Sequence, residues 1–446
     1  MVGRYKRQIL RLTESLRRLE SERDNLDTLL ALQNQIVQLI TKAEANIARL
    51  RETARKTTAE LKGGRLPKGE TGTLRKRIET YKKRIDDYQY LKFIWKCFGD
   101  GIAFIYLDKF ALKHTYYDTT DYMPKQDAGA LSGKTGLKQE WAILQAFKNR
   151  KIPAMLCDIT NTLRHGDICI LVGPDPMPIE VKSSSHANSR VERQVRSIKA
   201  LTGFFENDEA PNFRGFPRIT RVEFSPPEVT HLDVLNRCIA DSEGKPVSIA
   251  SPEPGLHYFC MREATGLEEL PAGTISSDSI LCVLNEAKRE REWPPYFPFT
   301  LSIRSPLHLY QFIRGEFTLA VLVDSAELRR QFSSRGLQIV LPHDGDWAIW
   351  MRRPGEEGAS AVSRQMFGRL FHEFQSLVWF AAVQSDYDRQ IEADLTQRGV
   401  LLKAGAETPE IGWPGEMPER IRRLFDEPRP VGETASMGSV VPAKQK

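Results

Sequence analysis

The chain has 446 residues, of which 41% are hydrophobic and 27% charged, so it can bury a sizeable core and form about two to four domains. Its apolar runs are far shorter than the roughly 18 residues that a membrane span needs, so we expect no membrane-spanning segment. The six cysteines are scattered without a C-x-x-C pair, and no apolar signal region opens the chain. These features argue against a disulfide framework or zinc ribbon and predict a cytoplasmic protein.

The positive charge is concentrated in the N-terminal arm. Residues 1–98 contain 23 Lys and Arg against 12 Asp and Glu, a net charge of +11, whereas the remainder has 41 basic and 46 acidic residues. A polyanionic partner such as a nucleic acid would meet this arm first. A solvated helix surface rich in Lys and Arg explains the composition equally well.

Residues 1–98 show the rhythm of a coiled coil. Apolar residues recur at alternating steps of three and four over 9–40, with Arg23 and Gln33 in two core positions. A Gly/Pro-rich stretch at 63–69 breaks the helix, and a second apolar series follows it. The pattern predicts a basic, coiled-coil helical hairpin that also serves as an interface for a homodimer or a partner protein.

The segment 99–134 is aromatic and connects the arm to a region, 135–226, in which helices and strands alternate. The expected order in that region is α-β-β-β-α-β. Its elements are a helix at 136–147, strands at 152–157, 167–172 and 178–182, an amphipathic helix at 189–204, and a strand at 219–224.

The region 227–426 alternates strands and helices without a recognisable motif, and 366–390 reads as one long helix. The residues 427–446 are rich in Pro, Gly and Ser and are expected to be disordered. The whole chain is therefore predicted to be an α+β multidomain protein.

Charged residues lie at one end of the otherwise apolar hairpin 167–182. A turn centred near 174–175 would place Asp167 beside Lys182, with Glu180 on the same side because strand side chains alternate. Burying two carboxylates is costly unless they bind a cation. A hard divalent ion such as Mg²⁺, for which Mn²⁺ could substitute, satisfies both.

The spacing of Asp167 from Glu180-Val181-Lys182 closely resembles the PD-(D/E)XK nuclease superfamily and its restriction-endonuclease-like core, over about 90 residues. That family shares the predicted element order and often places a Glu on the first helix, which Glu140 matches; Gly166 replaces the usual Pro before the Asp. The resemblance implies a Mg²⁺-dependent phosphodiester hydrolase. It implies that Asp167, Glu180, Glu140 and the Val181 carbonyl hold the metal, while Lys182 positions the attacking water.

Nucleic-acid contacts are expected around this site, with DNA favoured over RNA. The candidates are Ser184 after the third strand, Arg190 and Gln194 on the second helix, and Lys134 and Lys138 before and on the first helix. For the helix residues, a merely solvated face is equally consistent. His165, just before Asp167, is close enough in sequence to reach the site, although a histidine at a strand entrance is more often structural.

Other chemistries fit less well. The stretch 128–135 nearly spells a phosphate-binding P-loop but has Ala128 where the first Gly is required, and the dispersed histidines give no H-E-x-x-H. Two hypotheses of different classes remain. One is a metal-dependent nuclease acting in restriction, phage defence or repair, with RNA cleavage as a variant. The other is a non-cleaving nucleic-acid-binding or coiled-coil assembly protein with a nuclease-like fold.

Overall fold

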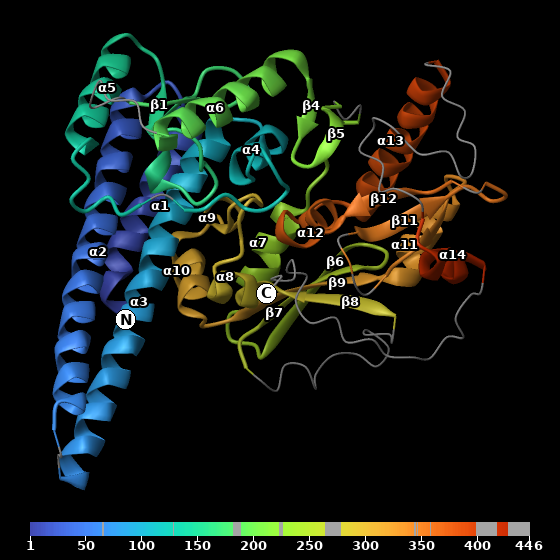
Figure 1. Cartoon of the computed structure of the whole chain (residues 1–446). Coiled ribbons are helices and arrows are strands. Elements are labelled where there is room, and N and C mark those ends of the chain that lie inside the picture. The colour runs from blue at the N-terminus through green and yellow to red at the C-terminus, as the bar shows by residue number, and fades with distance from the viewer. Residues whose placement is uncertain are drawn as a thin grey trace. The chain divides into compact units, whose positions relative to one another are not determined.

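The computed structural model describes residues 1–64, 67–127, 129–181, 189–222, 226–263, 278–342, 345, 347–356, 358–397 and 417–426 (Figure 1). The chain is α+β and divides into two compact units. The first comprises Met1–Asn207 and Phe297–Leu301, and the second comprises Asp208–Tyr296 and Ser302–Lys446. Of the helices in the described ranges, none combines the length and apolar composition that crossing a membrane requires.

A long helical hairpin makes up much of the N-terminal part of the first unit, as the sequence predicts. Its helices are α2 (Leu26–Lys62) and α3 (Lys68–Tyr106), which lie side by side (Figure 1). The preceding helix α1 (Lys6–Ser21) contacts both. The prediction of one continuous first helix is wrong, because the chain turns between α1 and α2. There Arg23 is exposed rather than in a core position, and the Asn25 side chain caps α2 by accepting from the Thr28 N–H.

The expected boundary at residue 98 falls inside α3. From Phe93 to Ile105 every residue of this helix is buried, which is typical of a helix surrounded by protein on all sides. The two positions on α2 and α3 that matter most for the rest of the unit are polar: Gln33 and Asp100, both buried. Gln33 donates to the Ala154 carbonyl and accepts from the Leu156 N–H, so α2 is bonded to an edge strand of the sheet that follows.

That sheet has three antiparallel strands in sequence order, and they correspond to the three consecutive strands that the sequence predicts. It is accompanied by the two helices expected on either side of it. The elements are α5 (Leu137–Asn149), β1 (Ala154–Leu156), η2 (Cys157–Ile159), β2 (Ile168–Ile170), β3 (Met177–Ile179) and α6 (Ser189–Asn207), with η1 (Val2–Tyr5), α4 (Lys109–Tyr116) and most of α9 (Phe299–Ser302) completing the unit.

The register of the second hairpin differs from the prediction by two residues. Ile168 pairs with Ile179 and Ile170 with Met177, so extending the ladder places Asp167 opposite Glu180 rather than Lys182. The turn is centred on 173–174, where Gly173 has a positive φ, and not on 174–175. A shift of two leaves every side chain on its predicted face, so the two carboxylates still share one side.

The fourth strand of the predicted core does not form as expected. Instead, β4 (Glu209–Phe213) and β5 (Phe216–Thr220) make a separate two-stranded sheet in the second unit. Arg214 and Gly215 both have positive φ, which turns the chain back on itself and lets Arg218 pair with Glu209. Residues 223 and 224 of the expected strand lie outside the described residues.

The second unit is built on two further antiparallel sheets, with strand orders β6-β7-β9-β8 and β10-β11-β12. Their strands are β6 (Val247–Glu253), β7 (Leu256–Met261), β8 (Ser279–Val283), β9 (Thr318–Asp324), β10 (Gln338–Val340), β11 (Trp347–Arg352) and β12 (Ser360–Ser363). The helices are α7 (Leu232–Asp241), α8 (Leu284–Glu290), α10 (Pro306–Arg314), α11 (Ser325–Ser333), α12 (Arg364–His372), α13 (Leu377–Gln397) and α14 (Glu419–Asp426).

The single helix predicted at 366–390 is two helices, α12 and α13. Phe374 adopts a positive φ between them, and the Glu253 carboxylate accepts from the Leu377 and Val378 N–H groups at the start of α13. A distant carboxylate thus caps a helix that the local pattern would have continued. The expected disordered tail, 427–446, lies outside the described residues.

Candidate functional site

Three carboxylates converge on one ammonium group in the first unit. Lys134 Nζ lies 2.8 Å from Glu140 Oε1, 2.7 Å from Asp158 Oδ2 and 2.9 Å from Asp167 Oδ1. These residues come from the loop before α5, the first turn of α5, the η2 turn after β1, and the entrance to β2. We call this group the carboxylate cluster.

Glu140 is the most deeply buried member, with 2% of its surface exposed. Burial raises the pKa of its carboxyl, against the opposing effect of the Lys134 ammonium. Its Oε2 atom is buried and has no hydrogen-bond partner, while Oε1 pairs with Lys134. An unpartnered carboxylate oxygen inside a polar cluster is the kind of atom that a bound cation or ordered water would satisfy.

Asp167 and Glu180 are driven to opposite protonation behaviour. Burial would raise the pKa of Asp167, but the Lys134 ammonium and the Val181 N–H outweigh it, and the pKa is lowered. For Glu180, burial and the hydrogen bond with Asp167 raise the pKa to about 7. The two carboxyls therefore behave as a pair that holds one proton near neutral pH when no further cation is present.

The backbone around Asp167 holds its side chain in place. The Val181 N–H donates to Asp167 Oδ2 at 2.9 Å, and the Asp167 N–H donates to the Ile179 carbonyl at 2.9 Å. Gly166 has a φ of +76°, and a Cβ atom there would lie 2.9 Å from the Ile179 carbonyl oxygen. Glycine is required where this tight entrance to β2 crosses the neighbouring strand.

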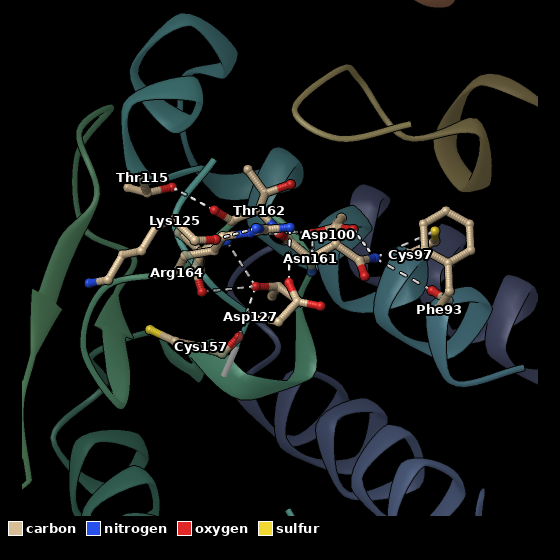
Figure 2. A network of polar contacts seen from close by, with 12 residues as sticks. Phe93, Cys97, Asp100, Thr115, Lys125, Asp127, Cys157, Asn161, Thr162 and Arg164 are labelled. Atoms are coloured by element: carbon tan, nitrogen blue, oxygen red, sulfur yellow. Dashed lines mark hydrogen bonds and ion pairs between the residues drawn. The ribbon is translucent and has the colours of Figure 1, made fainter. Parts of the chain in front are cut away.

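A buried network from α3 fixes the loop that leads to Asp167 (Figure 2). The Asp100 carboxylate accepts from the Asn161 N–H, the Thr162 N–H and the Asn161 side-chain amide at 2.8–2.9 Å. Arg164 then donates to the Asn161 and Lys125 carbonyls and pairs with Asp127 at 2.9 Å. The network ties the loops 117–127 and 160–166 together beside the carboxylate cluster.

His165 supports a second lysine instead of acting at the cluster directly. Its Nε2 lies 3.0 Å from the Tyr117 carbonyl oxygen, so Nε2 carries the proton and Nδ1 accepts from Lys125 Nζ at 3.0 Å. Burial lowers the pKa of Lys125, while Asp118 and Glu180 act in the opposite direction. Lys125 thus lies in the electrostatic field of Glu180 and is hydrogen-bonded to the buried imidazole of His165.

The structure brings together most of the residues that the sequence singled out. Asp167, Glu180 and Glu140 share the site with Lys134, and Val181 contributes its N–H. Lys138 is exposed on α5 and takes no part in the cluster. Lys182 and Ser184 lie outside the described residues.

The two candidates on α6, Arg190 and Gln194, are not part of the carboxylate cluster. Arg190 lies in the first turn of α6 and Gln194 is partly exposed one turn later. Ser197, which helical spacing places on the same side of α6 as Arg190 and Gln194, hydrogen-bonds the buried Thr119 hydroxyl at 3.0 Å. That part of the face therefore packs against the protein. Among the α6 side chains whose exposure the structure describes, the exposed cations are Arg193, Arg196 and Lys199.

Asp158 was missed by reasoning from the sequence. It lies two residues beyond β1, and because β1 and β2 are antiparallel, the end of β1 lies beside the start of β2, where Asp167 is. A polar residue directly after a short apolar strand was the available signal. Lys125 was missed as well, because its closeness to His165 depends on a loop without a regular pattern.

The Lys134 ammonium already occupies the centre of the carboxylate cluster. Among the described His, Cys, Asp and Glu side chains, no group of three or more is arranged to hold a metal ion. The three carboxylate oxygens lie 2.7–2.9 Å from the Lys134 nitrogen, whereas Mg²⁺ binds oxygens at about 2.1 Å. The donors are all hard oxygens, which suit Mg²⁺ or Mn²⁺, but in this structure they are spaced for an ammonium.

Comparison with models of known protein families, with curated proteins and with solved structures gives no match to this chain. Function is therefore inferred from the carboxylate cluster and the elements that carry it.

Proposed function

We propose that the protein is a metal-dependent nuclease that hydrolyses phosphodiester bonds, with DNA as the preferred substrate. The observation that carries this proposal is the convergence of Glu140, Asp158 and Asp167 on a single cation, with Glu180 hydrogen-bonded to Asp167. Four carboxylates at one edge of a small sheet are expensive to bury without a function that needs them.

The fit of a divalent ion is supported by the chemistry of the donors. Asp167, Glu180 and Glu140, joined by Asp158 and the Val181 carbonyl, offer oxygen ligands, and Glu140 Oε2 is buried without a partner. A bound Mg²⁺ supplies an activated water and neutralises charge that develops on the phosphoryl group. Burial and the hydrogen bond with Asp167 raise the pKa of Glu180 to about 7, so a further cation at the cluster would favour its ionised form.

The chain's own cations would complete the site. Lys134 and Lys125 lie at or beside the carboxylates, where they can bind the scissile phosphate and stabilise its negative charge in the transition state. The role of positioning the attacking water stays with Lys182, as the resemblance implies. The order α5-β1-β2-β3-α6 supports a restriction-endonuclease-like core, although its fourth strand is lacking from the described sheet.

We further propose that two copies act together when both strands of a duplex are cut, because one site cuts one strand. The hairpin helices α2 and α3 already bury their shared seam within one chain, so dimerisation would use a surface other than that seam. Light scattering of the full chain during plasmid linearisation tests this. If the protein stays monomeric while it cuts both strands of a plasmid in one binding event, the proposal that two copies act together is wrong.

A non-cleaving nucleic-acid-binding protein is the second candidate. The specific observation in its favour is Lys134, which neutralises part of the cluster without any metal. In that case the carboxylates would be a structural ion-pair network, and substitution of Asp158 would change stability alone.

The deciding experiment incubates purified protein with supercoiled plasmid, linear duplex, single-stranded DNA and RNA, each with Mg²⁺, Mn²⁺ or EDTA. Glu180→Gln and Asp158→Asn are compared with Glu206→Gln, an exposed carboxylate on α6 that serves as the matched control. We expect metal-dependent cleavage in wild type and control, and at least a 100-fold loss in both site variants. Binding without cleavage under every condition would favour the second candidate, and cleavage that survives Glu180→Gln would place the active site elsewhere.

A further inference from the structure

Two consecutive heptads of α3 repeat one pattern. Residues 74–80 read Leu-Arg-Lys-Arg-Ile-Glu-Thr and residues 81–87 read Tyr-Lys-Lys-Arg-Ile-Asp-Asp. Each heptad has an apolar or aromatic residue, then three cations, then isoleucine and an acidic residue. The cations, which we call the α3 basic face, are Arg75, Lys76, Arg77, Lys82, Lys83 and Arg84.

The repeat separates two surfaces of the helix. Leu74 is buried and Ile78, Tyr81 and Ile85 are partly buried, as expected for the seam that faces α2. All six cations are exposed. Because residues seven apart lie on almost the same side of a helix, each triplet is repeated about 10.5 Å further along the axis.

The α3 basic face is not neutralised by the protein around it. Within the described residues, none of its six cations takes part in an ion pair. On α2, by contrast, Arg55 and Lys56 both pair with Glu52. Like charges crowded on one helix destabilise it, so this arrangement favours an external anion that supplies the missing counter-charge.

The side chains around these cations indicate which kind of anion the α3 basic face binds. Helices that lie on membranes combine cations with large exposed apolar side chains. The large apolar residues that the structure shows exposed are Met123, Val172, Met177, Val229, Leu307 and Val378, and none of them lies on the hairpin. A purely ionic surface repeated along a straight helix suits a backbone of regularly spaced phosphates.

We propose that the α3 basic face binds the phosphate backbone of a nucleic acid without reading its sequence, and so holds the polymer while the carboxylate cluster acts on it. The inference rests on the proposed function only in taking this polymer to be the substrate. Cations that contact phosphates release condensed counterions, so their contribution is visible as a salt dependence of binding.

The test measures binding of a fluorescein-labelled 30-base-pair duplex by anisotropy in EDTA, from 50 to 200 mM NaCl. The variant Lys82→Gln/Lys83→Gln/Arg84→Gln removes one triplet. Its matched control, Arg420→Gln/Arg422→Gln/Arg423→Gln, removes three exposed cations from the amphipathic helix α14. Each phosphate contact contributes roughly 0.9 to the slope of log Kd against log salt, so the α3 variant should lower that slope by about 3 and the control should leave it unchanged.

Equal slopes for the wild type and the α3 variant, at equal helical content by circular dichroism, would overturn the proposal. So would binding to phosphatidylserine vesicles that the α3 variant loses while its duplex binding is intact, because that result would assign the face to a membrane. The two proposals can be told apart. If the wild type cleaves no substrate but the α3 variant still has a lowered slope, the nuclease proposal is wrong and the binding role of the α3 basic face is supported.

Discussion

The Asp100 carboxylate binds both the backbone and the side-chain nitrogen of Asn161, at 2.9 and 2.8 Å. This pair joins α3 to the loop that leads into Asp167, and it is buried on both sides. The helical arm therefore holds the candidate site in position and is not an appendage to it.

Replacing Asp100 should damage stability and the site together. Asp100→Ala leaves the Asn161 and Thr162 N–H groups buried without an acceptor, which we expect to cost about 3 kcal/mol or more. Urea unfolding measures the loss, and the exposed α3 residue Glu79 provides the control, since Glu79→Ala should change stability by less than about 0.5 kcal/mol. Equal midpoints for the two variants would contradict the anchoring role of Asp100.

The packing of α3 against the η2 turn predicts opposite effects for two glycines of one helix. A Cβ atom at Gly99 would lie 2.0 Å from the Ile159 carbonyl oxygen, whereas one at Gly72 meets nothing within 4 Å. Gly99→Ala should destabilise the first unit by more than about 2 kcal/mol because backbone must move. Gly72→Ala should stabilise by up to about 1 kcal/mol through helix propensity. Thermal unfolding of both variants measures these changes. If Gly99→Ala melts at the wild-type temperature, α3 does not approach the Ile159 carbonyl as closely as the structure shows.

Lys134 should compete with a divalent ion for the carboxylates. Lys134→Met removes the ammonium and leaves Glu140, Asp158 and Asp167 without a counter-charge, so the variant should melt at a lower temperature than the wild type in EDTA. Saturating Mg²⁺ should then raise its melting temperature more than it raises that of the wild type. Lys138→Met, on the exposed side of α5, is the control. If Mg²⁺ has the same effect on Lys134→Met as on the wild type, Lys134 does not share the metal's position.

The raised pKa of Glu180 predicts that the free energy of unfolding falls as pH rises. Its pKa of about 7 lies above the ordinary value of 4.5, so the folded protein holds a proton there that the unfolded chain releases. The stabilisation is present below pH 4.5 and is lost as pH rises to about 7. In EDTA, Glu180→Gln should therefore match the wild type at pH 4.5 and melt at a higher temperature at pH 8.

Scanning calorimetry at both pH values checks this, with Glu206→Gln as an exposed carboxamide control. With Mg²⁺ at pH 8 the order should reverse, because only the wild type retains the carboxylate ligand. If Glu180→Gln and the wild type have the same melting temperature across the whole pH range, the pKa of Glu180 is not raised in the folded protein.

The sequence was sufficient for features that depend on local patterns. The helical hairpin follows from its apolar spacing, and the strand alternation of 167–182 places Asp167 and Glu180 on one side even though the turn is shifted. Glu140 was singled out by the resemblance and not by helical spacing, and it lies on the buried side of α5 with Leu144.

What the sequence did not reveal depends on partners far along the chain. Asp100 is 61 residues from Asn161 and lies in a helix buried on all sides, so no face marks it as special. The break before α13 depends on Glu253, more than a hundred residues earlier. The break before α2 was readable in principle, because Asn25 is a strong helix-capping residue, but the heptad rhythm around it obscured the signal.

The hydrogen bonds of Gln33 also bear on how the molecule folds. They join α2 to β1 across 121 and 123 residues of chain, so this edge of the sheet has a high contact order and gains its backbone partner only after both helices of the hairpin exist. During synthesis the hairpin leaves the ribosome before these strands, and its local contacts form quickly. It then acts as a template on which the later strands find their register, so a slow step in refolding should be the docking of 154–179 onto a preformed helical arm.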